Sequence, residues 1–157
     1  MSTFSSHFAR YLIAENVFLN LAAANKLQAF ALIASRLQCN EQLNRRLVYE
    51  KLCARENMDS TGLGSGVAIP HAQVPGLRHP IAAFARLQQA IAYVAPDEQP
   101  VSELFVLLLP VKTTRAHLQI LADIAELLCD PQFRQQLNQA QQVDAIMTSF
   151  QHTALSA

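Results

Sequence analysis

Hydrophobic positions repeat at helical spacing through much of the first third of the chain. Between residues 25 and 38 the apolar side chains lie three or four positions apart, which predicts an amphipathic helix that Asn25 can cap. The same spacing predicts a second helix from about Glu41 to Glu56, with Asn40 as its cap. Residues 1–61 contain neither glycine nor proline, so we expect this whole part of the chain to be helical.

The pattern changes after residue 61, where all four glycines and all seven prolines occur. Short apolar runs at 66–69, 81–87 and 91–94 are typical of strands, and a turn is expected between the last two. The run at 101–109 is apolar enough for a strand in the middle of a sheet, covered on both faces.

Helical patterns return in the C-terminal part of the chain. Thr113 and Thr114 supply a cap for a long helix to about Cys129, Asp130 and Pro131 start a short helix, and residues 142–150 form the last one. The predicted class is α/β (mixed α+β), with a small mixed β-sheet of four to five strands flanked by helices on both faces. At 157 residues the chain is expected to form a single domain.

Composition narrows the classes of function. Twelve basic and twelve acidic side chains give no net charge, which argues against bulk electrostatic binding to nucleic acid or to anionic lipid. No apolar run reaches the length of a membrane span, and no secretory signal is visible, so no direct membrane insertion is expected. Three widely spaced cysteines suit reduced thiols. We therefore expect a cytoplasmic protein.

The segment before residue 71 is the most unusual part of the sequence. Gly62, Gly64 and Gly66 alternate just after Ser60 and Thr61, and such a loop can expose backbone N–H groups to an anion. The alternative is a plain loop between a helix and a strand. A strand follows the glycines, so the dinucleotide-binding fingerprint fails, and no P-loop motif is present.

Three side chains are candidates for anion chemistry around this loop. His71 follows Pro70 at the end of a short apolar run, where its ring is expected at a sheet edge, although a lone histidine is more often structural. Arg55 continues the apolar face of the second helix and suits phosphate or carboxylate; the alternative is a structural ion pair with Glu56, Asp59 or another acid. His117 falls in the first turn of the long helix, where an anion is favoured, or is simply half exposed there.

These residues form a longer motif. Its members are Arg55-Glu56, Ser60-Thr61-Gly62, Gly64, Gly66 and Ala68-Ile69-Pro70-His71. The motif closely resembles the active-site signature of the enzyme IIA proteins of the fructose/mannitol class of the bacterial phosphoenolpyruvate:sugar phosphotransferase system, most of all the nitrogen-regulatory enzyme IIA subfamily. Similar segments at 91–92, 99–101, 104–110 and 116–118 extend the resemblance over about residues 20–150. One departure is Ala72, where glycine is frequent.

The resemblance implies a single enzyme IIA domain over residues 1–157, with its core at about 10–152, and a set of functional residues. His71 is implied to accept a phosphoryl group on Nε2, with His117 beside it to hold the phosphate and Arg55 to contact phosphate or a partner. The loop of Ser60, Thr61, Gly62, Gly64 and Gly66 would lie around the phosphate, without a catalytic role assigned to either hydroxyl. No metal and no organic cofactor are implied.

The resemblance also implies partners. A phosphorylated HPr-like carrier is the expected donor, and Leu63, Val74 and Leu77 are candidates for the docking surface. The favoured role is a phosphocarrier that regulates target proteins according to its phosphorylation state. The alternatives are a sugar-transport enzyme IIA that passes phosphate to a fructose- or mannitol-specific IIB protein, and a regulatory domain that works by binding alone. Oligomeric state and targets do not follow from the sequence.

Overall fold

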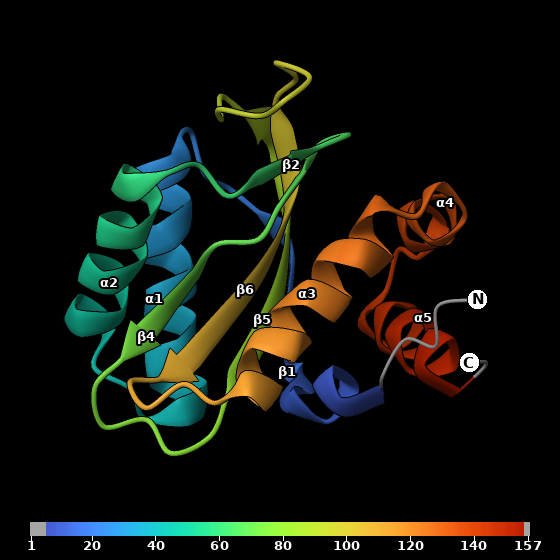
Figure 1. The fold of residues 1–157 in the computed structure, drawn as a ribbon. Helices are drawn as coiled ribbons and strands as arrows, with labels where there is room; N and C mark the ends of the chain where they lie inside the picture. Colours follow the sequence, from blue (N-terminus) through green and yellow to red (C-terminus); the bar gives the residue numbers. More distant parts are fainter. Residues whose placement is uncertain (1–5, 156–157) are drawn as a thin grey trace.

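A computed structural model describes residues 6–155 of the chain, with side chains described from residue 8 to residue 151 (Figure 1). One sheet of six strands lies between two layers of helices. In chain order the elements are the 3₁₀ helix η1 (Ser6–Tyr11), β1 (Leu12–Leu21), α1 (Lys26–Glu41), α2 (Arg45–Met58), β2 (Gly62–Gly64), β3 (Val67–Ala68), β4 (His71–Val74), β5 (Ile81–Ile91), β6 (Val101–Pro110), α3 (Arg115–Cys129), α4 (Pro131–Gln139) and α5 (Val143–Leu155).

The sheet is mixed, as the sequence predicted. Its strand order is β1-β5-β6-β3-β2, and β4 also pairs with β6. The β5–β6 and β2–β3 pairs are antiparallel, whereas β1–β5, β3–β6 and β4–β6 are parallel. Short strands β3 and β4 therefore lie one after the other along the same edge of β6, separated only by Ile69 and Pro70.

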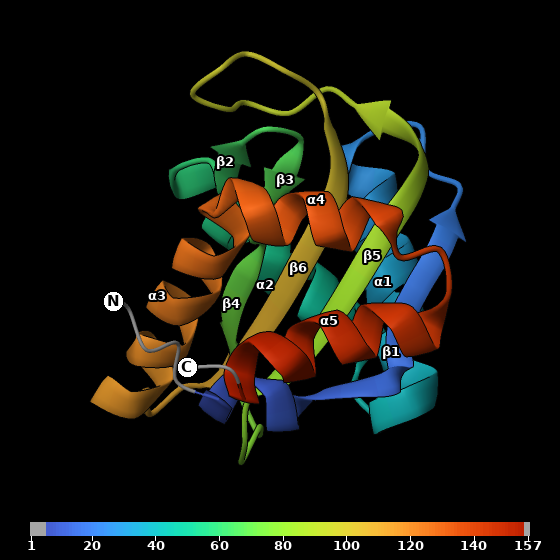
Figure 2. The ribbon, with the colours of Figure 1, turned by 90° about the vertical axis from the view of Figure 1, so that its right-hand side faces the viewer.

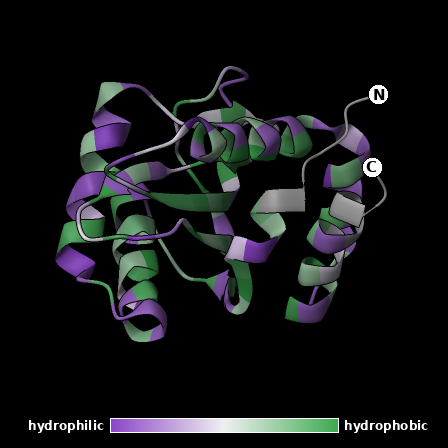
Figure 3. Cartoon of the chain, turned by 60° about the horizontal axis from the view of Figure 1, so that its bottom comes forward, coloured by the Kyte–Doolittle hydropathy of each residue, from purple (hydrophilic) through white to green (hydrophobic). Residues whose placement is uncertain are grey.

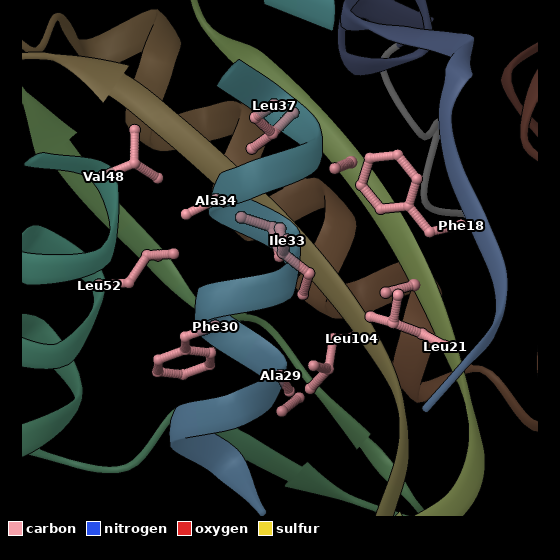
Figure 4. Close-up of a cluster of buried hydrophobic side chains, with 14 of the residues drawn as sticks. Phe18, Leu21, Ala29, Phe30, Ile33, Ala34, Leu37, Val48, Leu52 and Leu104 are labelled. Carbon is pink, nitrogen blue, oxygen red and sulfur yellow. The ribbon is translucent and has the colours of Figure 1, made fainter. Parts of the chain in front are cut away.

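Each face of the sheet carries its own hydrophobic cluster. Helices α1 and α2 cover one face, and η1, α3, α4 and α5 cover the other (Figures 1 and 2). Successive residues of β6 point to opposite faces: Leu104 and Val106 join the cluster under α1 and α2, whereas Phe105 and Leu107 join the other cluster. Figure 4 shows side chains of α1 reaching Leu104 between the helices and the sheet.

Colouring by hydropathy shows the same division. The helices carry both hydrophobic and hydrophilic residues along their length, as expected for elements with one buried side and one exposed side (Figure 3). The apolar strand β6 is buried along nearly its whole length, which confirms the prediction for residues 101–109. No helix in the described part of the chain is long and apolar enough to cross a membrane.

Local capping signals predicted most helix starts correctly. Asn25 caps α1 by accepting a hydrogen bond from the Gln28 N–H, Thr114 caps α3, and Asp130 caps α4 with Pro131 in its first turn. The prediction for α2 was wrong at its start, because α1 continues to Glu41 and Asn44 caps α2.

The cap predicted at Asn40 has a different role. Its side-chain amide donates to the Glu15 carbonyl oxygen at 2.6 Å and to Asn16 Oδ1 at 3.1 Å. Asn40 therefore ties the end of α1 to β1 instead of starting α2.

The sheet has more strands than the four to five expected. The N-terminal part is not wholly helical: Leu12–Leu21 form β1, which is placed by parallel pairing with β5, a contact distant in sequence. The two strands predicted at 81–87 and 91–94 are one strand, Ile81–Ile91, and Val94 lies beyond it, 72% exposed. The fold class and the helices on both faces are confirmed.

Candidate functional site

The position of His71 is set by the β2–β3 hairpin and by the interruption between β3 and β4 at Ile69 and Pro70. Strands β2 and β3 pair with Gly62 opposite Ala68, and their turn uses positive φ at Ser65 and Gly66. After β3 the Ile69 N–H donates to the Thr61 carbonyl oxygen at 3.0 Å, and the Pro70 carbonyl accepts from the Leu107 N–H. His71 then begins β4 at the edge of β6, so it opens a strand of its own at the predicted sheet edge.

The alternation of β4 sets the face to which His71 points. Ala72 and Val74 are buried in the cluster under α1 and α2. His71 and Gln73 occupy the opposite face, and His71 pairs with Leu107, which packs in the cluster on the α3 side. Val74 is only 2% exposed, so its candidacy for a docking surface is wrong, because that side chain belongs to the core.

One hydrogen bond fixes the tautomer of His71. Its Nδ1 lies 2.8 Å from the Ile69 carbonyl oxygen, two residues earlier in the chain. A carbonyl oxygen only accepts hydrogen bonds, so Nδ1 carries the hydrogen and the neutral ring keeps its lone pair on Nε2. The half-buried ring therefore has a nucleophilic nitrogen on Nε2.

Its surroundings favour the neutral ring. Burial is the largest effect and lowers the pKa of His71 below its usual value, and the charge of Arg55 lowers it further. The hydrogen bond to Ile69 and the charge of Glu56 act in the opposite direction without reversing the shift. His71 is consequently unprotonated at Nε2 at neutral pH, as a nucleophile requires.

Arg55 lies at the C-terminal end of α2 and is half buried, as its place on the helix predicted. Its Nη1 donates to the Asp59 backbone carbonyl oxygen at 2.7 Å, which holds the guanidinium beside the last turn. Within the described residues Arg55 forms no ion pair with Glu56 or Asp59, so the structural pair considered as the alternative is not formed. The guanidinium is close enough to influence the pKa of His71.

His117 occupies the third position of α3 and completes a capping box with Thr114. The Thr114 N–H donates to Nδ1 of His117 at 3.2 Å, and the His117 N–H donates to the Thr114 hydroxyl oxygen at 3.2 Å. Since Nδ1 accepts a hydrogen bond, the neutral ring carries its hydrogen on Nε2. His117 therefore presents an N–H donor from the helix N-terminus.

A side-chain contact joins β4 to the start of α3. Gln73, on the same face of β4 as His71, donates through Nε2 to the Thr113 hydroxyl at 2.8 Å. Thr113 in turn donates to the Pro110 carbonyl oxygen. The structure thus links β4, the strand that begins at His71, to the residue just before the N-cap of α3, the helix that carries His117.

The glycines each have a structural reason for their place. A Cβ on Gly62 would lie 2.4 Å from the Val94 carbonyl oxygen, and Gly64 and Gly66 adopt positive φ at the hairpin tip. The Ser65 N–H donates to the Asp97 carboxylate at 2.7 Å, so that N–H already has an anionic partner. Of these three glycines, only Gly62 lies at the open end of the hairpin, where it pairs with Ala68. The chain continues from Ala68 to His71 at this end. A phosphate contact at these glycines stays a prediction.

Sequence reasoning missed a buried polar cluster behind this loop. Glu56 is 8% exposed, and its carboxylate accepts from the Thr61 N–H and hydroxyl and from Lys26 Nζ, with the Ser60 hydroxyl also nearby. Tyr93 shares a 2.8 Å hydrogen bond with the Thr61 hydroxyl. Glu56 was visible next to Arg55 in the motif, but no local signal connected it with Lys26 or Tyr93.

Comparison with known proteins identifies the family of this chain. Residues 10–153 match the family model described as "Phosphoenolpyruvate-dependent sugar phosphotransferase system, EIIA 2". A nitrogen regulatory protein of Pseudomonas aeruginosa is 38% identical over 105 residues, which cover 67% of this chain and 68% of that protein.

Two solved structures share the fold. The nitrogen regulatory protein IIA-Ntr of Neisseria meningitidis has a TM-score of 0.86 and 30% identity, over 92% of this chain and 99% of that one. A mannitol enzyme IIA of Escherichia coli, solved in complex with phosphorylated enzyme IIB, has a TM-score of 0.71 and 19% identity over 88% of this chain and 95% of that one. The resemblance seen in the sequence is confirmed: the chain belongs to the EIIA 2 family of the phosphoenolpyruvate-dependent sugar phosphotransferase system.

Proposed function

We propose that this chain is a phosphocarrier of the phosphoenolpyruvate-dependent phosphotransferase system. It accepts a phosphoryl group from an HPr-like protein on Nε2 of His71 and regulates target proteins in the cytoplasm. The observation that carries the proposal is the hydrogen bond from His71 Nδ1 to the Ile69 carbonyl, because it directs the ring's lone pair to Nε2. The family assignment supports a phosphotransferase component of this kind.

The proposed transfer balances without a further reactant. The lone pair on Nε2 of His71 forms a P–N bond as the P–N bond to the donor's histidine breaks, and the donor ring leaves with that electron pair. The His71 hydrogen stays on Nδ1, where Ile69 accepts it, so the cationic phosphorylated ring remains hydrogen-bonded. The Nε2–H of His117 and the guanidinium of Arg55 supply a donor and a positive charge for the phosphoryl oxygens.

The names of the relatives favour a regulatory role over sugar transport. Nitrogen regulatory proteins at 36–38% identity are slightly more similar to this chain than a fructose-specific EIIA component of Haloferax volcanii at 35%, and more so than the fructose-specific EIIABC component of Bacillus subtilis at 31%. The mannitol relative solved with phosphorylated IIB supports the alternative, onward transfer to a IIB protein. Rapid loss of label to a purified fructose- or mannitol-specific IIB would favour transport, whereas retention of label supports regulation.

Phosphorylation tests the proposal directly. The chain is incubated with phosphoenolpyruvate, enzyme I and an HPr-like carrier, and its intact mass is measured. We expect a gain of one phosphoryl group in the wild type and none in His71→Ala. The matched control is His79→Ala, which removes an exposed histidine and keeps the label. A wild type that takes no label would favour the domain that works by binding alone, and label in His71→Ala would refute the assignment of His71.

A further inference from the structure

Glu56 is a buried carboxylate that collects hydrogen bonds from the loop before His71. Its Oε1 accepts from the Thr61 N–H at 3.1 Å, and its Oε2 accepts from the Thr61 hydroxyl at 2.6 Å. The Ser60 hydroxyl lies 3.2 Å from Oε1, but its one hydrogen is directed mainly to the closer Val94 carbonyl oxygen. Lys26 Nζ lies 3.4 Å from Oε1 and balances the charge. The carboxylate thus fixes both the backbone and the side chain of Thr61.

From Thr61 the hydrogen bonds continue to the ring of His71. The Thr61 carbonyl oxygen accepts the Ile69 N–H at 3.0 Å, and the Ile69 carbonyl oxygen accepts His71 Nδ1 at 2.8 Å. The carboxylate is therefore linked to the imidazole through the backbones of Thr61 and Ile69. Since the Ile69 carbonyl selects the tautomer, whatever fixes Ile69 also fixes which nitrogen is nucleophilic.

We propose that Glu56 is a positioning residue for His71. By holding the Ser60–Thr61 segment against Ile69, it keeps the Ile69 carbonyl aimed at Nδ1 and leaves the lone pair on Nε2. The effect on phosphoryl transfer rests on the proposed function, but the effect on the tautomer does not, because the tautomer is a property of the free protein.

The position requires an ionised carboxylate, not just a polar side chain. Burial by itself raises the pKa of Glu56, but the hydrogen bonds from Thr61 and the charge of Lys26 outweigh burial and lower it. An ionised carboxylate accepts hydrogen bonds through both oxygens. A glutamine whose NH₂ took the place of Oε1 would face the Lys26 ammonium and the Thr61 N–H, which only donate.

The first test measures the tautomer and the transfer rate together. Protein labelled with ¹⁵N in histidine gives the tautomer of His71 by NMR, with the signals assigned by their loss in His71→Ala. In Glu56→Gln we expect a mixture of tautomers and a transfer rate from the HPr-like carrier lowered about 10- to 100-fold, since small misplacements of a reacting group cost this much. The matched control is Glu50→Gln, which removes a carboxylate from the exposed side of the same helix.

A wild-type tautomer and a wild-type rate in Glu56→Gln would overturn the inference while leaving the proposed function intact. If the wild-type chain takes no phosphoryl group, the proposed function fails, and the tautomer comparison alone still decides the role of Glu56. These two failures are therefore distinguishable.

A second pair of variants decides the question if Glu56→Gln does not fold. Thr61→Val removes the hydroxyl that binds Glu56 and keeps the side-chain shape, whereas Thr61→Ser keeps the hydroxyl. We expect a lower fraction of the Nδ1–H tautomer and a slower transfer in Thr61→Val than in Thr61→Ser. Equal tautomer fractions and equal rates in the two variants would overturn the inference.

Discussion

The imidazole of His71 carries its hydrogen on Nδ1, whereas the imidazole of His117 carries its hydrogen on Nε2. The difference arises from the backbone, because a carbonyl oxygen accepts from the first ring and an N–H donates to the second. The Nε2 atoms consequently differ in chemistry: one is a nucleophile and the other is a hydrogen-bond donor. In the proposed phosphotransfer, His117 would therefore act as a hydrogen-bond donor to the phosphoryl group and not as a second nucleophile.

Helix capping by His117 and its proposed role as a hydrogen-bond donor to the phosphoryl group can be tested separately by substitution. His117→Ala removes the capping-box side chain, so we expect a loss of about 0.5–1 kcal/mol in the free energy of unfolding. It also removes the Nε2–H donor proposed to contact the phosphoryl group. Phosphoryl transfer is therefore expected to slow about 100-fold, the usual effect of deleting one hydrogen-bond donor that stabilises a transition state in an enzyme. Urea unfolding and labelling kinetics measure the two effects.

His117→Gln is the matched control, because glutamine at this position also completes a capping box. We expect its stability to equal that of the wild type and its labelling to be slower than wild type but faster than in His117→Ala. Equal labelling rates for wild type and both variants would remove His117 from the proposed site.

The rate of phosphoryl acceptance is expected to depend on pH through His71. The pKa of this ring is lowered by burial and by the charge of Arg55, so most of the rings are already unprotonated at Nε2 at pH 6.5, the ordinary pKa of histidine. As the pH falls through the lowered pKa, Nε2 gains a proton and the rate decreases. In Arg55→Gln the charge is gone, the pKa of His71 rises, and the decrease begins at a higher pH. A midpoint that moves to lower pH in Arg55→Gln would contradict this account.

The same shift predicts a change in stability with pH. Just below pH 6.5, His71 is protonated in most unfolded chains but still unprotonated in most folded chains, because its pKa is lower in the folded state. The free energy of unfolding therefore decreases as the pH falls, until the pH is below the pKa of the folded state. His71→Gln removes this contribution, so its free energy of unfolding should depend less on pH in that window. The difference between the two pH profiles in urea unfolding measures it.

Features decided by neighbouring residues were predictable from the sequence. The caps at Thr114 and Asp130 are contacts over two or three residues, and the apolar run of β6 directly reports burial on both faces. Strand β1 was missed because its position depends on pairing with β5, some seventy residues later. Asn40 and Asn44 both suit a cap, and only the contact of Asn40 with β1 separates their roles.

In the candidate site, too, local features were predictable from the sequence, whereas contacts between distant residues were not. His71, Arg55 and His117 were identified through a motif and a helix start, which are local features. The tautomers of the two histidines depend on the paths of particular backbone groups, and the Glu56 cluster depends on Lys26, 30 residues away in sequence. The sequence therefore indicated the candidate side chains, whereas the hydrogen bonds that set their tautomers and positions form only in the folded chain.

A close backbone approach at Gly62 predicts a loss of stability on substitution. In Gly62→Ala the new Cβ would lie 2.4 Å from the Val94 carbonyl oxygen, which also accepts a hydrogen bond from Ser60. Because that contact is with backbone, we expect a loss of about 1–3 kcal/mol in the free energy of unfolding. Gly76→Ala is the control, since a Cβ there meets nothing within 4 Å and adds only the strain of positive φ. A smaller loss for Gly62→Ala than for Gly76→Ala would contradict the predicted clash.

The buried pair of Arg86 and Glu103 joins the sheet to the end of α4. The two residues are cross-strand partners on β5 and β6, and Arg86 Nη2 lies 2.9 Å from Glu103 Oε2. The guanidinium also donates to the carbonyl oxygens of Leu137 and Ala140, at and just after the last turn of α4. Because both side chains are largely buried, removing one partner leaves an uncompensated charge in the interior.

We therefore expect Glu103→Leu to lower the free energy of unfolding by about 3–5 kcal/mol, and the double variant Arg86→Met/Glu103→Leu to lose less than the sum of the single changes. The exposed pair Arg46 and Glu50 on α2 is the matched control, with an expected coupling of only about 0.3–0.5 kcal/mol. Urea unfolding of both double-mutant cycles gives the two coupling energies. Equal coupling in the buried and exposed pairs would show that burial does not govern this interaction. Neither pair includes His71, His117 or Arg55, so the fraction of each variant that stays folded should still accept the phosphoryl label.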